Sequence, residues 1–127
     1  MQPDHRLRVL VVDDHEDSAR ALASLVGIWG HEAHTAFTGF AALVEANDFR
    51  PDVVLCDLAM PGINGCKVAE SLRRHSALSG TLLVAVTAFG DEDHRRQAAR
   101  AGFHAHLVKP VDTDGLQRLL RYQAMNA

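Results

Sequence analysis

Short apolar runs alternate along the chain with stretches whose apolar residues recur every three or four positions. Val9 to Val12 is continuously apolar and rich in β-branched residues, as expected of a strand that is covered on both faces. The next apolar residues recur at helical spacing: Leu22, Leu25, Val26 and Trp29. Gly30 follows directly and is placed to end this helix. The chain therefore opens with a strand followed by a helix.

The same alternation continues to the end of the chain. Strands are predicted at residues 9–12, 32–36, 53–56, 82–86 and 105–108. The later helices are marked by Phe40, Leu43 and Val44, by Val68 and Leu72, by residues 91–101, and by Leu116, Leu119 and Leu120. Thr38 is the predicted N-cap of the second helix, and Gly102 is predicted to end the fourth. Strands that alternate with helices predict parallel βαβ crossovers and a doubly wound α/β domain.

Length and composition agree with one folded domain. The chain has 127 residues, of which 47% are hydrophobic and 23% are charged. These values are close to those of an average globular domain, and such a chain buries enough surface to need no disulfide or structural metal. We therefore expect a single domain over residues 1–127, with a core at about residues 7–124.

Charge and hydropathy exclude several classes of protein. The formal net charge of −3 argues against a chain whose main role is to bind nucleic acid directly. No apolar run approaches the roughly 18 residues of a membrane span, and the run that ends at Asp13 is too short for a signal peptide. Two cysteines are too few for a disulfide scaffold. A cytoplasmic location without membrane insertion is the expectation.

Polar and charged residues follow the predicted strands at one edge of the sheet. Asp13 and Asp14 follow the first strand, Asp57 the third, Thr87 the fourth and Lys109 the fifth. Singly, each is more readily explained as a turn or capping residue. In such sheets, however, ligands bind outside the carboxyl ends of the strands. Charged groups brought together there are costly unless they pair or bind a cation, so their joint placement predicts a functional site.

The chemistry of these groups suggests phosphoryl transfer. Three carboxylates attract a hard divalent cation such as Mg²⁺, which takes oxygen ligands. A carboxylate can also act as a nucleophile and form an aspartyl phosphate. A metal ion and Lys109 would neutralise the phosphoryl oxygens, and the Thr87 hydroxyl could donate a hydrogen bond to one of them. The pattern thus predicts a site that accepts a phosphoryl group.

Four motifs in this chain resemble those of the receiver domain of two-component response regulators. They are Val11 to Asp14, Asp57 to Gly65, Val86 to Ala88 and Leu107 to Pro110. The resemblance covers essentially the whole chain. It implies a flavodoxin-like sheet of five parallel strands in the order 2-1-3-4-5.

The resemblance also implies a role for each site residue. Asp57 would be the phosphoacceptor, Thr87 the switch hydroxyl and Lys109 the cationic partner of the phosphate. The metal, Mg²⁺ or Mn²⁺, would be held by side chains and one backbone carbonyl, from Asp13, Asp14, Asp57 and Ala59.

Family membership would define the partners. The phosphoryl donor would be a phosphohistidine on a histidine kinase or a phosphotransfer protein. The downstream target would bind the face formed by the fourth helix, the fifth strand and the fifth helix. Self-phosphorylation and autodephosphorylation would be its only catalytic activities. The chain is either a stand-alone regulator or the receiver of a hybrid histidine kinase, and both remain open here.

Three positions depart from the usual family pattern. His106 stands three residues before Lys109, where the family usually has Tyr or Phe. This residue is expected to act with Thr87 in the switch, by moving into the space that the threonine hydroxyl vacates. Ala59 and Phe89 stand two residues after Asp57 and Thr87, respectively.

Two other functions share parts of this pattern. A flavodoxin-like flavin-binding domain would need a loop rich in Ser, Thr or Gly after the first strand, whereas residues 13–17 are mostly acidic. A haloacid-dehalogenase-like phosphatase would need a second acid two residues after the nucleophile. Ala59 occupies that position. Both alternatives are disfavoured by these residues.

Overall fold

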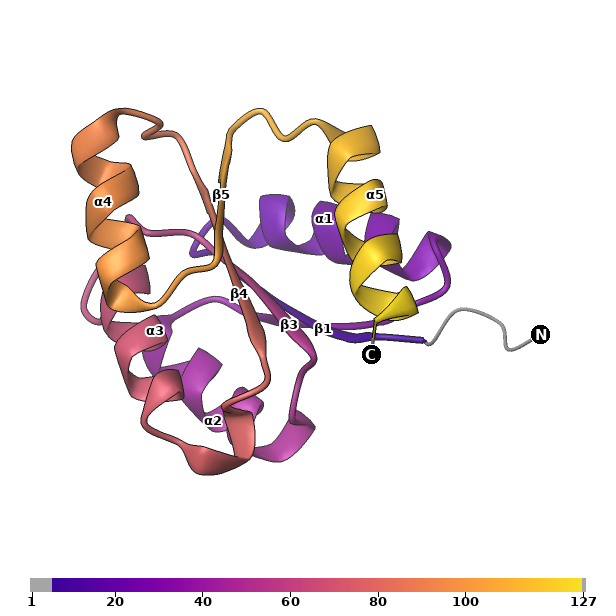
Figure 1. The fold of residues 1–127 in the computed structure, drawn as a ribbon, viewed down its shortest axis with the longest axis horizontal. Helices are drawn as coiled ribbons and strands as arrows, with labels where there is room; N and C mark the ends of the chain where they lie inside the picture. The colour runs from indigo at the N-terminus through magenta and orange to yellow at the C-terminus, as the bar shows by residue number, and fades with distance from the viewer. Residues whose placement is uncertain (1–5, 127) are drawn as a thin grey trace.

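The computed structural model describes residues 6–126 and shows an alternating α/β chain (Figure 1). The strands are β1 (Arg8–Val12), β2 (Glu32–Ala36), β3 (Val53–Cys56), β4 (Leu82–Thr87) and β5 (Ala105–Val108). The helices are α1 (Glu16–Ile28), α2 (Gly39–Phe49), α3 (Gly65–Arg73), α4 (Glu92–Ala101) and α5 (Thr113–Met125), with a short 3₁₀ helix at Ser76–Leu78. Every predicted strand is confirmed to within one residue at each end. The 3₁₀ helix was not predicted.

All five strands are parallel and lie in the order β2-β1-β3-β4-β5. Val12 at the end of β1 pairs with Cys56 at the end of β3, and Cys56 pairs with Ala85 of β4. This register aligns the carboxyl ends of the central strands. The predicted doubly wound fold, and the strand order implied by the resemblance, are confirmed.

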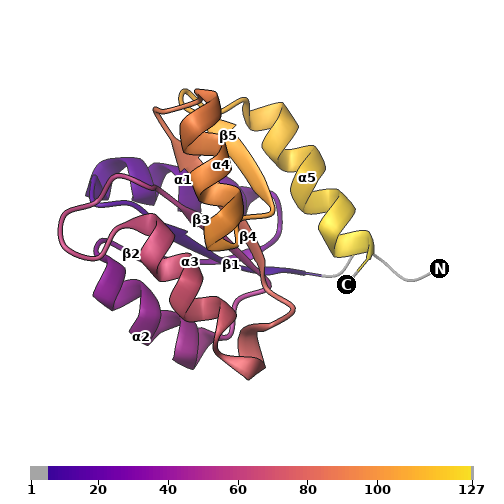
Figure 2. The same cartoon turned by 60° about the vertical axis from the view of Figure 1, so that its left-hand side comes forward.

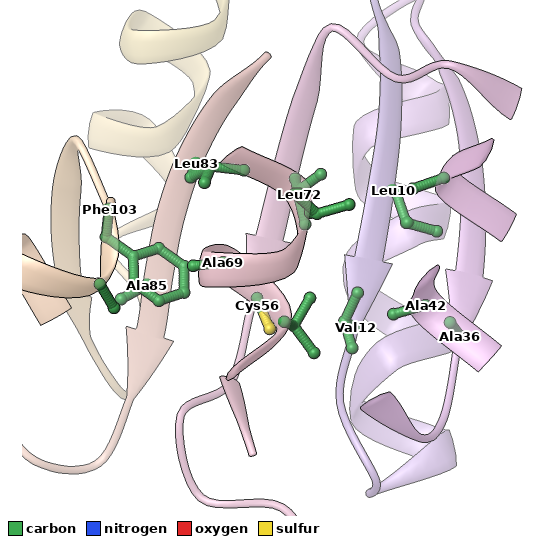
Figure 3. Packing of buried hydrophobic residues seen from close by; sticks show 14 of the residues in the cluster. Leu10, Val12, Ala36, Ala42, Cys56, Ala69, Leu72, Leu83, Ala85 and Phe103 are labelled. Carbon is green, nitrogen blue, oxygen red and sulfur yellow. The ribbon is translucent and has the colours of Figure 1, made fainter. Parts of the chain in front are cut away.

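Helices cover both faces of the sheet (Figures 1 and 2). Alternate strand residues point to opposite faces, so Val9 and Val11 pack with α1 and α5, while Leu10 and Val12 pack with α2, α3 and α4. All four side chains are at most 2% exposed. Figure 3 shows part of the layer between the sheet and helices α2, α3 and α4, in which small and large apolar side chains interlock. The central strands are therefore fixed from both sides.

Helix α2 buries mainly a different face from the one predicted, although Leu43 of the predicted face is partly buried and packs against the core. Phe40 and Val44 are 69% and 49% exposed, whereas Ala42, Ala46 and Phe49 are buried. The alanines let the helix lie close to the sheet, and this places the bulkier residues on the outer side. The helix is apolar on more than one face, so its periodicity alone could not select the buried one.

Local signals set the ends of two helices as predicted. The Thr38 hydroxyl oxygen accepts a hydrogen bond from the Ala41 backbone N–H at 3.0 Å and so caps α2. Gly102 has a φ of 120° and ends α4. Asp91 is the N-cap of α4, and the helix itself begins at Glu92. Across residues 6–126, no helix combines the length and apolar character needed to cross a membrane.

Candidate functional site

Three carboxylates meet at the carboxyl edge of the sheet. Asp13 directly follows β1 and Asp57 directly follows β3, and their residues are only 6% and 8% exposed. The Asp57 backbone N–H donates to the carbonyl of Val12 at 2.9 Å, which continues the pairing of the two strands. Asp14 is exposed. One oxygen of each acid lies within 4.8 Å of the others, so the predicted acidic cluster is present.

The Asp57 carboxylate is held from two sides. Its Oδ1 accepts the Ala59 backbone N–H at 3.1 Å, and its Oδ2 accepts the Lys109 ammonium at 3.1 Å. Gly65, the first residue of α3, packs directly on this segment, because a Cβ there would lie 2.3 Å from the Asp57 carbonyl oxygen. The start of α3 can therefore approach the phosphoacceptor candidate only with glycine at this position.

Lys109 bridges two of the three acids. Its Nζ donates to Asp13 Oδ2 at 2.8 Å as well as to Asp57. Its backbone N–H donates to the Thr87 carbonyl at 2.8 Å, which fixes where the side chain begins. Partial burial opposes the charged form, but the hydrogen bonds to Asp13 and Asp57 outweigh this effect and raise the pKa of Lys109. The ammonium is therefore charged throughout the neutral range.

Thr87 ends β4 and is fully buried. Its hydroxyl oxygen accepts the Phe89 backbone N–H at 3.3 Å. This contact links the predicted switch hydroxyl to the loop between β4 and α4, which spans residues 88–91.

The donor set fits a hard divalent cation. The three carboxylates outnumber the one ammonium that contacts two of them, so the cluster has a net negative charge. All the side-chain donors are oxygens, which Mg²⁺ and Mn²⁺ prefer. Ala59, whose backbone carbonyl is the remaining candidate ligand, lies exposed in the loop that follows Asp57.

The thiol beside the candidate phosphoacceptor is not a competing nucleophile. Cys56 is fully buried, and burial, followed by the negative charge of Asp57, raises the pKa of its thiol. Its Sγ–H donates to the Asp57 carbonyl at 3.3 Å. A thiol that stays protonated is a packing residue rather than a reactive one.

A cavity of about 350 Å³ opens beside the acids, between α1 and the loop that joins β5 to α5. Its walls include Leu22 and Leu25 of α1 and Val111 of the loop, and it reaches Asp57 and Lys109 at one end. The sequence did not indicate this cavity, because it depends on how far apart α1 and α5 lie.

The three atypical positions lie at the edge of the site. His106 is half-buried on β5, and its Nε2 makes a 2.8 Å hydrogen bond to the Phe89 carbonyl. Phe89 is 45% exposed and stacks on His94, with ring centroids 4.7 Å apart. Ala59 contacts the cluster through its backbone N–H, and its side chain is only a methyl group. His106 and Thr87 thus both bond to the backbone of Phe89, while the switch movement expected of His106 stays a prediction.

Comparison with known proteins gives one consistent family. A family model described as the response regulator receiver domain matches residues 9–121. The chain is 35% identical over 122 residues to the regulatory protein AtoC of Escherichia coli, covering 93% of this chain but only 26% of AtoC. It is 31% identical over 113 residues to the protein PilH of Pseudomonas aeruginosa, covering 89% of this chain and 93% of PilH.

Solved structures agree with the sequence comparisons. The chemotaxis protein CheY4 of Vibrio cholerae superposes with a TM-score of 0.87 at 26% identity, covering 92% of this chain and 98% of CheY4. These similarities favour neither the flavin-binding nor the phosphatase alternative.

Proposed function

Because the chain belongs to the response regulator receiver domain family, whose members interact with histidine kinases or phosphotransfer proteins, we propose that Asp57 accepts a phosphoryl group from a phosphohistidine. The observation that carries this proposal is the surroundings of the Asp57 carboxylate, which accepts a hydrogen bond from the Lys109 ammonium and lies in one cluster with the acids Asp13 and Asp14. Phosphorylation would then change the conformation of the domain and pass on a two-component signal.

The chemistry is a direct transfer. An oxygen of the Asp57 carboxylate forms a bond to phosphorus while the bond from phosphorus to the donor imidazole nitrogen breaks, and the imidazole keeps the electron pair. The Lys109 ammonium, already 3.1 Å from Asp57, neutralises charge on the phosphoryl oxygens. The Thr87 hydroxyl turns from Phe89 toward the new group and starts the conformational change.

Asp13, Asp14, Asp57 and the Ala59 carbonyl would hold Mg²⁺ or Mn²⁺. When bound, the cation supplies positive charge that offsets repulsion between the incoming phosphate and the carboxylates. The protein's part is to hold two of these acids in fixed positions, since Asp13 and Asp57 both follow buried strands.

Phosphorylation is expected to require a divalent cation. Incubation with a small acyl phosphate such as acetyl phosphate and Mg²⁺ should add one phosphoryl group to the intact protein, as read by its mass. Excess chelator should reduce the phosphorylated fraction to the background of an untreated sample, because three carboxylates then repel the donor. Undiminished phosphorylation in chelator would show that the acidic cluster does not bind a functional cation.

The cavity beside Asp57 gives the donor protein a place to bind. It is lined mainly by apolar groups of α1 and of the β5–α5 loop, and it ends at Lys109 and Asp57. A protein that presents a phosphohistidine to Asp57 must approach this edge, so apolar side chains near its histidine would enter the cavity. A small phosphodonor needs no such contact.

Ala21→Gln should separate these two kinds of donor. Ala21 is exposed on α1 and lines the cavity, so a longer neutral side chain would obstruct a protein without changing the charge near the acids. We expect transfer from a phosphorylated histidine phosphotransfer protein to slow by about tenfold or more, equivalent to about 1.4 kcal/mol. Phosphorylation by acetyl phosphate should be unchanged.

The matched control is Ala99→Gln, which places the same side chain at an exposed position of α4. It should leave both reactions at the wild-type rate. Equal slowing by the two variants would mean that the cavity has no special part in donor binding.

A further inference from the structure

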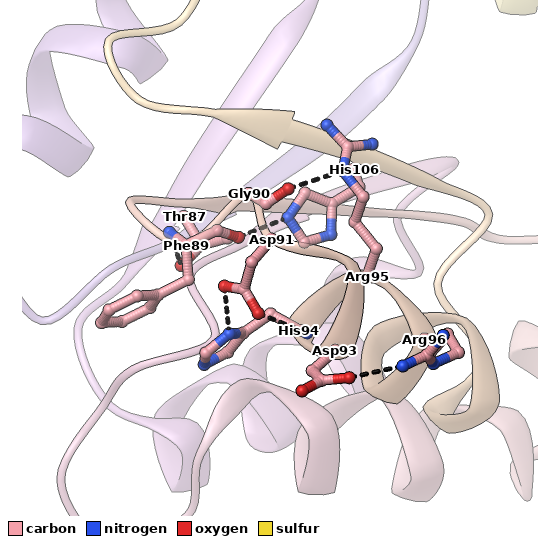
Figure 4. A network of polar contacts seen from close by, with 9 residues as sticks. All are labelled: Thr87, Phe89, Gly90, Asp91, Asp93, His94, Arg95, Arg96 and His106. Atoms are coloured by element: carbon pink, nitrogen blue, oxygen red, sulfur yellow. Dashed lines mark hydrogen bonds and ion pairs between the residues drawn. The ribbon is translucent and has the colours of Figure 1, made fainter.

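The loop between β4 and α4 is tied to β5 and to α4 by its two consecutive carbonyls (Figure 4). The Phe89 carbonyl accepts a hydrogen bond from His106 Nε2 at 2.8 Å, and the Gly90 carbonyl accepts one from Arg95 Nε at 2.9 Å. Gly90 also packs on Val108, because a Cβ at this position would lie 2.6 Å from a Val108 methyl. The loop therefore lies directly on the edge strand.

Phe89 connects this loop to three elements. Its N–H donates to the Thr87 hydroxyl, its carbonyl accepts from His106, and its ring stacks on His94 at an interplanar angle of 14°. His94 is itself held by the Asp91 carboxylate, which lies 2.6 Å from its Nδ1. A displacement of Phe89 would therefore change its contacts with both β5 and the first turn of α4.

The hydrogen bond to a carbonyl fixes the tautomer of His106. A carbonyl oxygen only accepts, so Nε2 must carry the hydrogen, and the neutral imidazole then has a bare Nδ1. Nδ1 is buried and makes no hydrogen bond to any of residues 6–126. A proton added to Nδ1 would create a buried N–H without an acceptor, on a charged ring.

The charged groups around the ring do not compensate such a proton. From α4, the Arg95 side chain donates to the Gly90 carbonyl, next along the loop from the carbonyl that accepts from His106, and so brings a positive charge to the same loop (Figure 4). The Asp91 carboxylate accepts hydrogen bonds from His94. Slight desolvation opposes the ionisation of Asp91, but these hydrogen bonds outweigh it and lower the pKa of Asp91. Further along β5, Lys109 is directed at Asp13 and Asp57. A proton on Nδ1 would therefore find a hydrogen-bond acceptor only if the ring turned toward solvent.

We propose that His106 holds the β4–α4 loop on β5 only as a neutral imidazole, and that its protonation releases Phe89. The surface formed by α4 and β5 would then respond to pH as well as to the movement of the Thr87 hydroxyl. The response to pH stands on the geometry alone, whereas the response through Thr87 rests on the proposed phosphorylation of Asp57.

An NMR titration of the unphosphorylated full chain tests the pH response directly. On the alkaline side of the transition, the His106 ring nitrogens should show the Nε2–H tautomer. On acidification, the backbone amide resonances of Phe89 and Gly90 should shift with the same midpoint as the His106 ring. An Nδ1–H tautomer, or loop resonances that do not follow the His106 ring, would overturn the proposal.

Two variants assign the response to one side chain. His106→Phe keeps a ring of similar size but cannot donate a hydrogen bond or titrate, so the pH-dependent shifts of Phe89 and Gly90 should be lost. His104→Gln is the control, because His104 lies on the same chain segment but accepts the Leu83 N–H, away from the loop. It should leave those shifts intact. Persistence of the shifts in His106→Phe would assign them to another group.

A third arm tests the link to Thr87. Beryllofluoride and Mg²⁺, which together mimic a phosphoryl group on a carboxylate, should change the midpoint of the His106 titration in the wild type. An unchanged midpoint with beryllofluoride bound would remove the link to Thr87 while leaving the pH response in place. Absence of binding would instead contradict the proposed function, so the two failures are distinct.

Discussion

Asp57→Asn is expected to abolish phosphorylation by every donor. The amide cannot attack phosphorus as a carboxylate does, and Asp13 already accepts hydrogen bonds from Lys109 and from the His15 backbone N–H. Asp57→Asn keeps the shape of the side chain and can still accept from the Ala59 N–H. The fold should therefore be retained, and the variant should gain no phosphoryl mass under conditions that fully modify the wild type.

Asp48→Asn is the matched control, because Asp48 is an exposed acid on α2, remote from the cluster. It should be phosphorylated at the wild-type rate, and thermal unfolding should show that both variants are folded. Modification of the folded Asp57→Asn protein at an undiminished rate would assign the phosphoryl group to another residue.

Lys109→Met should have the second largest effect. The ammonium is the only cation among residues 6–126 that forms an ion pair with Asp13 or Asp57. Removing one preorganised donor from a site of developing negative charge commonly costs on the order of 100-fold in rate. We expect a loss of about this size in phosphorylation by acetyl phosphate. Lys109→Arg should also be impaired, because a planar fork does not fit the space of an ammonium between two carboxylates.

Lys67→Met is the control for this change. Lys67 is exposed on α3 and pairs only weakly with Glu70, at 3.7 Å. It should leave phosphorylation unchanged. A wild-type rate in Lys109→Met would mean that the lysine only pairs with the acids of the unmodified protein and does not assist phosphoryl transfer.

The raised pKa of Lys109 determines the sign of a pH effect on stability. Because folding raises the pKa of Lys109, its contribution is fully present below the unfolded pKa of about 10.4 and is lost as the pH rises through the higher folded value. The difference in free energy of unfolding between wild type and Lys109→Met should therefore be constant near neutral pH and shrink only in strong alkali. A difference that changes around neutrality would show that another group controls it.

The sequence predicted the acidic cluster because two strong signals coincide there. The runs before Asp13 and Asp57 are apolar enough to be central strands, and parallel strands bring their carboxyl ends to one edge. Because β1 and β3 are parallel neighbours, Asp13 and Asp57 lie side by side although they are far apart in sequence, as the hydrogen bond from the Asp57 N–H to the Val12 carbonyl shows. The positions of Thr87 and Lys109 follow from the same geometry.

Other features depend on packing that periodicity does not encode. The sequence did not show that Gly65 is needed under Asp57, because the reason is contact with a carbonyl from another segment. It also did not show that Phe40 and Val44 face outward, since alanines and large apolar residues alternate around α2. The bond from His106 to the Phe89 carbonyl depends on the path of the β4–α4 loop, which no local pattern specifies.

Chemical trapping of the phosphoryl group shows whether Asp57 carries it. Borohydride reduces an acyl phosphate to the alcohol, so a phosphorylated aspartate is converted to homoserine. After treatment of wild-type protein with acetyl phosphate and Mg²⁺, followed by reduction and peptide mass analysis, homoserine is expected at position 57 alone. Homoserine at position 13 or 14, or stable phosphate on a hydroxyl or imidazole side chain with none at 57, would show that Asp57 is not the phosphoacceptor.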